Sequence, residues 1–332
     1  MKDVRKLQIT ANGTYIVTIP KAWVDSLGLT KGDPLSLSLQ GNEISITPVL
    51  RKQQSIESRS ISVEDFTDAR LLEMCITSSY VVGNDIMEVK SGKESGHEWK
   101  SWVRESLDGL LGVEISEEYS TRIMLQNLID PYKFDLVGEL SKFMNNSMAV
   151  LLDSIHASGD LREDLASDAF RRGKELIKSY RFLMRLASLA SRSIELREKY
   201  GFKTIQKLMI SVIAIREMGR ISYYSMRTAQ HVTEIGNVLS PEFTGLLESM
   251  ASHTVEMSLK AFDSLKGNDI KKASEVLEMM KKVRNIFAQI HEMENDLPAQ
   301  DRLPMTLIIR GIRAIAGYAV ALADDSVLNI YA

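Results

Sequence analysis

Three basic residues near the start of the chain, Arg5, Lys6 and Lys21, have side chains that can contact nucleic acid. Lysine and arginine gain affinity by neutralising backbone phosphates, and arginine can also read the edges of guanine bases. Further positive charge flanks the same segment at Lys2, Arg51 and Lys52. The alternative interpretation is that so small a basic patch is an ordinary solvated surface. The residues alone leave both interpretations open.

Two His/Glu pairs have a spacing that can hold a metal ion, His253 with Glu256 and His291 with Glu294. In a helix, residues three apart share a face, as in carboxylate-ligated di-iron bundles. Such pairs also arise by chance in a helical chain with 44 acidic residues, and we favour chance.

The other reactive side chains form no catalytic pattern. The sequence contains neither G-x-S-x-G nor G-x-x-x-x-G-K-[ST], and Cys75 has no identifiable histidine partner. Asp324 and Asp325 are expected at a solvated helix end. We therefore expect no catalytic residues and no enzymatic activity.

The composition describes a chain of two or three domains in a reducing compartment. Its 332 residues exceed the usual size of one core, and 44% hydrophobic residues can fill several. The single cysteine excludes a disulfide within the chain. No signal segment is evident, and the apolar run over 314–323 is too short to span a bilayer. These features predict a cytoplasmic protein without a membrane span.

Charge is distributed unevenly along the chain, whose formal net charge is -3. Residues 1–52 carry seven Lys and Arg against four Asp and Glu, whereas the remainder carries 34 against 40. The N-terminal segment is therefore the basic part, where a nucleic-acid contact is most plausible on charge.

The first 52 residues show the period-two alternation of half-buried strands, in KLQIT, TYIVTIP, LSLSLQ and EISITP. Asn12-Gly13 and Gly41-Asn42 are tight-turn pairs, and residues 21–27 form a short helical turn that ends at Gly28. The order β-β-α-β-β follows. Four strands of four to six residues bury little by themselves, so we expect this domain to pair with a second copy.

Residues 58–130 follow a polar linker and predict a small α+β domain. The segments SISVEDF, NDIMEVKS and VEISEEYSTRIMLQNLI read as strands, the last as a strand pair, with helices over 68–83 and 97–112. Trp99 and Trp102 are expected to anchor the second helix to the sheet.

Residues 134–332 predict about six helices in two three-helix repeats, near 134–238 and 240–330. The breaks are glycine- or proline-containing, and apolar residues recur every three or four positions between them. Small residues in RISYYSMRTA, from Arg220, and AIAGYAVALA, from Ala314, place the third and sixth helices centrally. We expect narrow apolar seams in three of these helices, over 137–155, 205–229 and 308–326.

With these motifs in view, the chain resembles archaeal proteins that fuse an AbrB/MazE-like swapped-hairpin domain to a PhoU phosphate-uptake regulator domain. The motifs that carry the resemblance are V-x-I-P-K and L-G-L-x-x-G-D in the N-terminal segment, and LGVEISEE and LQNLIDP after it. It implies a multidomain fold: an all-β swapped-hairpin domain, a small α+β middle domain, and all-α PhoU-like tandem three-helix bundles.

The chain departs from this family at the positions that hold its metal clusters. Glu175 and Tyr180 match the pattern E-x-D-x-x-Y, but Ile177 takes the aspartate position. The remaining three motifs have also lost their carboxylates, to Lys282 and Arg284, to Tyr223, and to Gly317. Because cations need oxygen or nitrogen ligands and are repelled by a Lys-Arg pair, we expect no metal cofactor.

The resemblance implies a dimeric, DNA-binding transcriptional regulator of the phosphate response, with residues 1–52 as the dimerisation module. The helical domain would take its input from a partner such as a phosphate transporter ATPase or a sensor protein. Two alternatives stay open. One is an adaptor that regulates a phosphate transporter without binding DNA, and the other is a metal-binding bundle of ferritin type.

Overall fold

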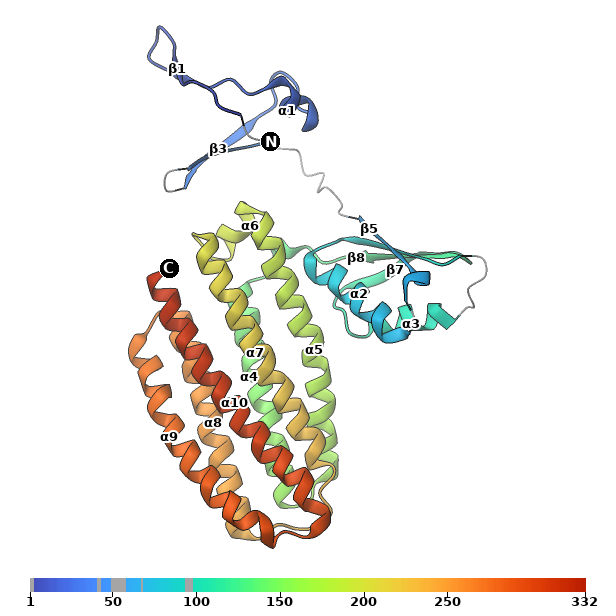
Figure 1. The fold of residues 1–332 in the computed structure, drawn as a ribbon, viewed down its shortest axis with the longest axis vertical. Coiled ribbons are helices and arrows are strands. Elements are labelled where there is room, and N and C mark those ends of the chain that lie inside the picture. The colour runs from blue at the N-terminus through green and yellow to red at the C-terminus, as the bar shows by residue number, and fades with distance from the viewer. Residues whose placement is uncertain (1–2, 41–42, 49–57, 67, 93–97) are drawn as a thin grey trace. The chain divides into compact units, whose positions relative to one another are not determined.

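The computed structural model describes all residues except 1–2, 41–42, 49–57, 67 and 93–97, and its chain divides into two compact units (Figure 1). The first unit is Met1–Ile56 and the second is Glu57–Ala332. Strands dominate the first unit, whereas the second combines a mixed sheet with a helical bundle. This arrangement confirms the predicted multidomain fold class.

The first unit consists of two antiparallel β-hairpins separated by one short helix. Its elements are β1 (Gln8–Ile9), β2 (Tyr15–Ile16), α1 (Lys21–Ser26), β3 (Leu35–Gln40) and β4 (Glu43–Pro48). The order is the predicted one, and Gly28 adopts a φ of 63° where the chain leaves α1. The first two strands are only two residues long, shorter than predicted, because a two-stranded ribbon without further partners is marginally stable.

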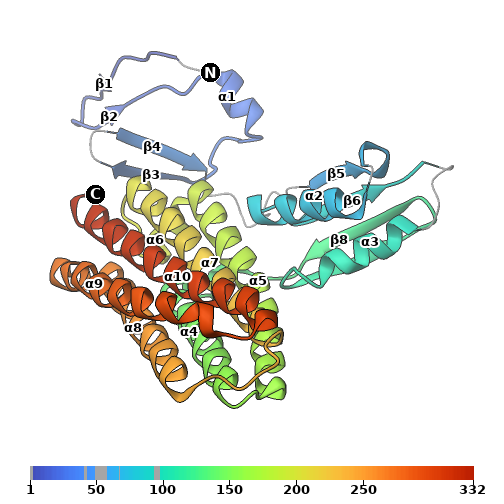
Figure 2. The same ribbon diagram turned by 60° about the horizontal axis from the view of Figure 1, so that its bottom comes forward.

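A four-stranded mixed sheet opens the second unit, in the order β5-β6-β8-β7. The strands are β5 (Ser58–Ser62), β6 (Ile86–Lys90), β7 (Val113–Glu118) and β8 (Arg122–Asn127). Only β5 and β6 run parallel. The helices α2 (Ala69–Val82) and α3 (Glu98–Leu107) share one hydrophobic core with the sheet (Figure 2). Trp99 is buried in that core and Trp102 packs against it, as predicted. We call residues 58–127 the sheet module.

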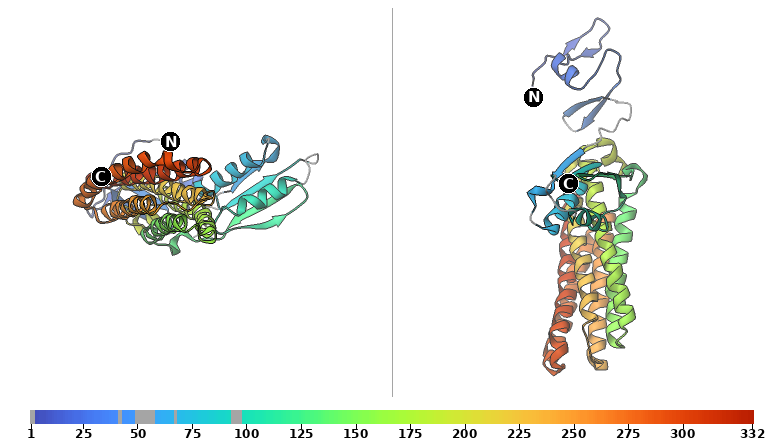
Figure 3. Two further views of the ribbon diagram at one scale, coloured as in Figure 1. Left: turned by 90° about the horizontal axis from the view of Figure 1, so that it is seen from below. Right: turned by 90° about the vertical axis from the view of Figure 1, so that its right-hand side faces the viewer.

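Long helices form the rest of the second unit and run alongside one another (Figure 3). They are α4 (Leu136–Gly159), α5 (Glu163–Arg192), α7 (Ile205–Val232), α8 (Pro241–Gly267), α9 (Ile270–Met293) and α10 (Ala299–Tyr331), with a short α6 (Ile194–Lys199) after α5. The six long helices match the six that the sequence predicts. A single hydrophobic core extends through all of them.

The third and sixth long helices, α7 and α10, pack against each other at the centre of this core. Tyr224 of α7 stacks on Tyr318 of α10, with ring centroids 5.9 Å apart. A Cβ atom on Gly311 would lie only 2.8 Å from the Thr228 hydroxyl. The small residues therefore permit the close approach that the sequence predicts.

Most residues of the predicted seams are buried, with exceptions at the first turns of two helices. Val137 is 39% exposed and Ile205 is 46% exposed. Both lie at helix starts, where fewer neighbouring helices cover the side chains. Along the middle of the helices the predicted seams are buried, or half-buried at Val212 and Gly219, and the prediction is wrong at Val137 and Ile205.

The helix α10 is long and apolar enough to cross a membrane by length and composition alone. Half of its most apolar stretch is buried inside the bundle, where it contacts α7, α8 and α9. The apolar character extends beyond the predicted run over 314–323, because the helix supplies core residues along most of its length. Its composition is explained by its central place in the bundle.

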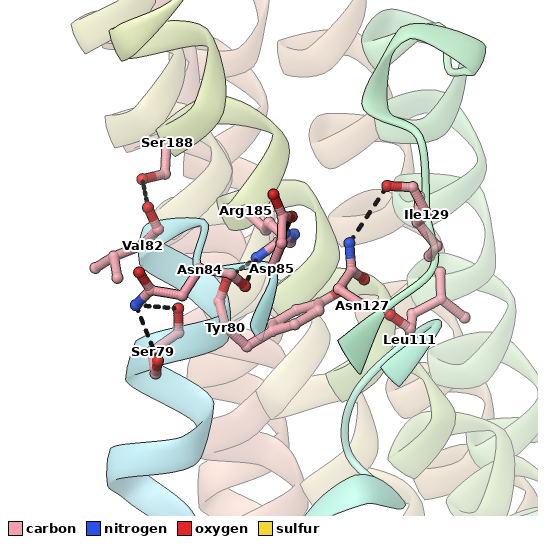
Figure 4. Close-up of polar contacts among 10 residues, drawn as sticks. All are labelled: Ser79, Tyr80, Val82, Asn84, Asp85, Leu111, Asn127, Ile129, Arg185 and Ser188. Carbon is pink, nitrogen blue, oxygen red and sulfur yellow. Dashed lines mark hydrogen bonds and ion pairs between the residues drawn. The ribbon is translucent and has the colours of Figure 1, made fainter. Parts of the chain in front are cut away.

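One arginine of the bundle joins the sheet module to α5 (Figure 4). The side chain of Arg185 is 2% exposed, and its Nη2 lies 2.6 Å from Oδ1 of Asp85. Its Nη1 donates to the backbone oxygens of Tyr80, at 2.6 Å, and Asn84, at 2.9 Å. Burial, opposed by the Asp85 carboxylate, lowers the pKa of Arg185 from its ordinary value. The guanidinium is therefore held by several acceptors at the end of α2.

Tyr80 completes this joint from the side of the sheet module. Its ring centroid lies 4.9 Å from the Arg185 guanidinium carbon, and its hydroxyl donates to the Leu111 backbone oxygen at 3.0 Å. Burial raises the pKa of Tyr80 to about 12, so the hydroxyl stays protonated and donating at neutral pH. Residues 58–130 and 134–332, which the sequence predicts as separate domains, are therefore in contact through Arg185 and Tyr80. Their division into two domains stays a prediction.

The C-terminal half of α10 carries a carboxyl group that the sequence places wrongly in solvent. Asp325 is only 7% exposed, and its Oδ2 has no hydrogen-bond partner among the described residues. Burial, together with the charges of Glu217 and Asp324, raises the pKa of Asp325 to about 6. The expectation of a solvated helix end holds for Asp324, which is exposed, and is wrong for Asp325 because α10 continues inside the core.

We predict that Arg185→Ala lowers the free energy of unfolding by about 3–5 kcal/mol, because it leaves the Asp85 carboxylate without its ion-pair partner and removes one donor from each of two carbonyl oxygens. Urea titration followed by circular dichroism measures this loss. Arg162→Ala removes an exposed arginine that pairs with Asp164, and it is expected to leave the urea midpoint unchanged. Equal midpoints for both variants would contradict the role of Arg185.

We predict that Asp325→Asn stabilises the protein at pH 7. The folded carboxyl keeps its proton up to pH about 6, whereas the unfolded one ionises near 3.8. The wild type therefore loses stability as pH rises through this window, on the order of 1–3 kcal/mol in total. Unfolding measured at pH 3.5 and pH 7 checks this, with Asp324→Asn as the exposed control. A gain that is the same at both pH values would refute the assignment.

Candidate functional site

The basic residues predicted to contact DNA are all exposed in the first unit. Nη2 of Arg5 lies 2.7 Å from Oδ2 of Asp3, so part of its charge is compensated. Lys6 and Lys21 form no ion pair with any residue that the structure describes. Arg5 and Pro20, the residue before Lys21, line the same groove. The flanking residues Lys2, Arg51 and Lys52 lie outside the described residues.

No described side chain between residues 3 and 48 is buried. Large apolar side chains in this range have exposures from 37% to 85%. They are Val4, Leu7, Ile9, Tyr15, Ile16, Val17, Ile19, Leu27, Leu37, Leu39, Ile44 and Ile46. A monomer that exposes so many large apolar side chains in so short a segment is unusual, and exposed apolar surface of this kind marks sites of association.

The apolar surface follows the alternation of β3 and β4. Leu37 pairs with Ile46, and Leu39 pairs with Ile44, so these four side chains share one face of the hairpin. Ser36 and Thr47 pair on the opposite face. A groove of about 370 Å³ lies between this hairpin and α1, where Trp23 and Val24 line it. The hairpin thus has one polar face and one uncovered apolar face.

In the second unit, a cavity of about 560 Å³ lies between α2, α5 and α7. Ile177 and Tyr180 of the first altered metal motif line it, as does Tyr223 of the matching motif on α7. Glu175 points elsewhere, with its Oε2 2.9 Å from Nζ of Lys178. We call this cavity the α2–α5–α7 pocket.

A smaller cavity of about 240 Å³ lies between α9 and α10. Arg284 and Gly317, which stand at the altered motif positions of the second repeat, both line it. If residues 134–238 and 240–330 are paired as the predicted repeats, the two cavities lie at matching helices, α5 with α7 and α9 with α10. Among the described residues, no group of three or more His, Cys, Asp or Glu side chains is placed to hold a metal ion. The expected absence of a metal cofactor stays a prediction.

The two His/Glu pairs lie on different helices and do not form one site. Nδ1 of His253 lies 2.8 Å from the Ser249 backbone oxygen, within its own helix. Glu256 lies near Lys260 instead, at 3.6 Å between Oε1 and Nζ. Only His291 and Glu294 approach each other, at 3.5 Å between Nδ1 and Oε1. Neither pair gathers the further ligands that a metal site needs.

Sequence reasoning missed the arginines of the α2–α5–α7 pocket. Arg216 and Arg220 lie one turn apart on α7, and Arg181 reaches the pocket from α5. The spacing of Arg216, Arg220 and Tyr223 signals one helix face. The wall formed by α2 comes from a distant segment, however, so only the tertiary structure shows that a cavity lies over that face.

Two protein families match parts of this chain. Residues 8–54 match the family described as "Antidote-toxin recognition MazE, bacterial antitoxin", and residues 247–326 match the PhoU domain. No curated protein matches the sequence. The first match covers both hairpins of the first unit, and the second covers most of α8 and α10 and all of α9. The chain therefore combines a MazE-antitoxin-like region at its N-terminus with a PhoU-like region at its C-terminus, which is the architecture that the sequence predicts.

Proposed function

We propose that this protein is a homodimeric, cytoplasmic regulator of the phosphate response that binds DNA through residues 1–52 and is not an enzyme. One observation carries the proposal. A MazE-like region with an uncovered apolar face and exposed basic residues occurs in the same chain as a PhoU-like region. The first region fits dimerisation and DNA binding, and the second fits phosphate regulation.

The uncovered face of β3 and β4 supports the homodimer. Leu37, Leu39, Ile44 and Ile46 can be removed from water by the same face of a second chain. A twofold-symmetric contact needs a surface that complements itself, and a two-stranded apolar face does so without charged groups. Exchange of hairpins between the two chains is the arrangement we propose.

The exposed basic residues support DNA binding by that dimer. Lys6 and Lys21 have no described ion-pair partner, and a dimer presents each of them twice. The doubled charge can neutralise phosphates on a duplex, whereas a single module has few contacts to offer. Arg5 would have to exchange Asp3 for a phosphate or a base, so we assign it a smaller share of the affinity.

The PhoU-like helical bundle is the part of the regulator that we propose receives the regulatory signal. Its PhoU-like region includes α9 and α10, which belong to the C-terminal part of the sequence, whereas the basic segment belongs to the N-terminal part. We propose that the bundle takes its input from a partner such as a phosphate transporter ATPase or a sensor protein.

We predict that the double variant Leu37→Glu/Ile46→Glu is monomeric, because it places two carboxylates in the proposed interface. Light scattering coupled to size-exclusion chromatography measures the mass. The matched control is Ser36→Glu/Thr47→Glu, the paired positions on the opposite face of the same strands, which is expected to remain a dimer. Dissociation by both variants, or by neither, would argue against this interface.

We predict that Lys6→Ala/Lys21→Ala weakens binding to duplex DNA and makes it less dependent on salt. Each phosphate contact contributes about 0.9 to the slope of log affinity against log salt concentration, so loss of four contacts per dimer lowers the slope by about 3–4. Fluorescence anisotropy with labelled duplex DNA over a salt series gives this slope. Lys199→Ala, which removes an exposed lysine of α6, should bind like the wild type.

The same measurements separate the DNA-binding regulator from the adaptor alternative. A protein that dimerises through β3 and β4 but has no affinity for duplex DNA at low salt would be an adaptor. In that case the N-terminal module would serve assembly only.

A further inference from the structure

The α2–α5–α7 pocket has the volume of a small-molecule site. Its volume of about 560 Å³ falls within the range of natural ligand pockets. The sheet module supplies one wall through α2, and the bundle supplies the others through α5 and α7. The pocket therefore spans the joint that Arg185 holds together.

Positive charge distinguishes this pocket from the rest of an acidic protein. Three arginines line it, and no aspartate or glutamate does. The side chains of Arg216 and Arg220 are exposed, and no described residue forms an ion pair or hydrogen bond with them. Unpaired guanidinium groups one turn apart can both bind one anion, and their planar donors suit phosphate or carboxylate oxygens.

Arg181, which lines the pocket from α5, is held in place by the sheet module. Its Nη2 lies 3.0 Å from Oε1 of Glu73, and its Nη1 donates to the Gly109 backbone oxygen at 3.2 Å. Glu73 compensates part of this charge, so the net attraction for an anion comes mainly from α7. Arg181 nevertheless adds a guanidinium from α5 to the lining of the same pocket.

The remaining lining of the pocket is largely apolar or aromatic. Tyr180 packs against Gly219, where an added Cβ would lie 2.5 Å from the ring. Tyr223 is half exposed and contacts Tyr224 edge to face, with ring centroids 5.4 Å apart. Val81 and Ile177 line the same cavity. A ligand that fills it therefore needs an apolar or aromatic body in addition to its negative charge.

We propose that the α2–α5–α7 pocket binds a phosphorylated small molecule with an aromatic body, the chemical class of nucleotides. The phosphates would lie against Arg216 and Arg220, and the body would lie against Tyr223 and the apolar wall. A bound ligand would contact the sheet module and the bundle together, which would strengthen their joint. This site is independent of the proposed DNA contact, since it lies wholly within the second unit.

Isothermal titration of the full-length protein with ATP, in the presence of EDTA, tests the proposal. We expect one ATP per chain, an affinity at least tenfold lower for Arg216→Gln/Arg220→Gln, and an unchanged affinity for Arg310→Gln, an exposed arginine outside the pocket. Lys6→Ala/Lys21→Ala should also bind ATP like the wild type, which separates this pocket from the basic N-terminal segment.

Inorganic phosphate serves as the second probe. Tyr223→Ala should weaken ATP binding and leave phosphate binding unchanged, because only ATP has an aromatic body. The arginine variants change exposed residues, so their circular dichroism spectra and urea midpoints should match the wild type. ATP binding that is absent, or equal in wild type and Arg216→Gln/Arg220→Gln, would overturn the proposal. Tighter, arginine-dependent binding of hexaglutamate than of ATP would also overturn it, in favour of an acidic peptide partner.

Discussion

The buried guanidinium of Arg185 is the interaction on which the second unit depends. Two separate hydrophobic cores, one in the sheet module and one in the bundle, meet at this side chain. A charge that is 2% exposed is costly unless it is paired and hydrogen-bonded, and here Asp85 and the carbonyl oxygens of Tyr80 and Asn84 accept from its two terminal nitrogens. These acceptors lie together at the end of α2. The ion pair therefore stabilises the contact between the sheet module and α5, and it also fixes the position of α2 on α5. The α2–α5–α7 pocket exists because α2 is held there.

The two units solve the problem of apolar burial in opposite ways. The second unit buries its apolar residues within one chain. Even α10, which is apolar enough by composition to cross a membrane, packs into the core of the bundle. The first unit has too few residues to do so, and it leaves Leu37, Leu39, Ile44 and Ile46 uncovered. The proposed pairing with a second copy and the proposed regulatory role therefore both rest on the same short hairpins.

Most of the positions at which the sequence departs from the expected metal-ligand motifs share one structural feature. Four of them line cavities of the bundle, with Ile177 and Tyr223 at one and Arg284 and Gly317 at the other. Where carboxylates would attract cations, these cavities present arginines, so their electrostatic preference is for anions. The buried carboxyl of Asp325 lies apart from both linings, near Glu217. At the positions where the resemblance implies metal ligands, the structure therefore has cavities lined by arginines.

The sequence by itself determined the order of elements, because hydrophobic periodicity and turn residues act locally. It predicted the two hairpins around α1, the mixed sheet module, the six long helices, and the central place of α7 and α10. The tertiary structure decided which polar residues are buried, since burial depends on segments far apart in the chain. Arg185 and Asp325 look like ordinary helix-surface residues in the sequence, yet both are buried. Arg216 and Arg220 line a pocket only because α2, more than 130 residues earlier in the chain, forms its opposite wall.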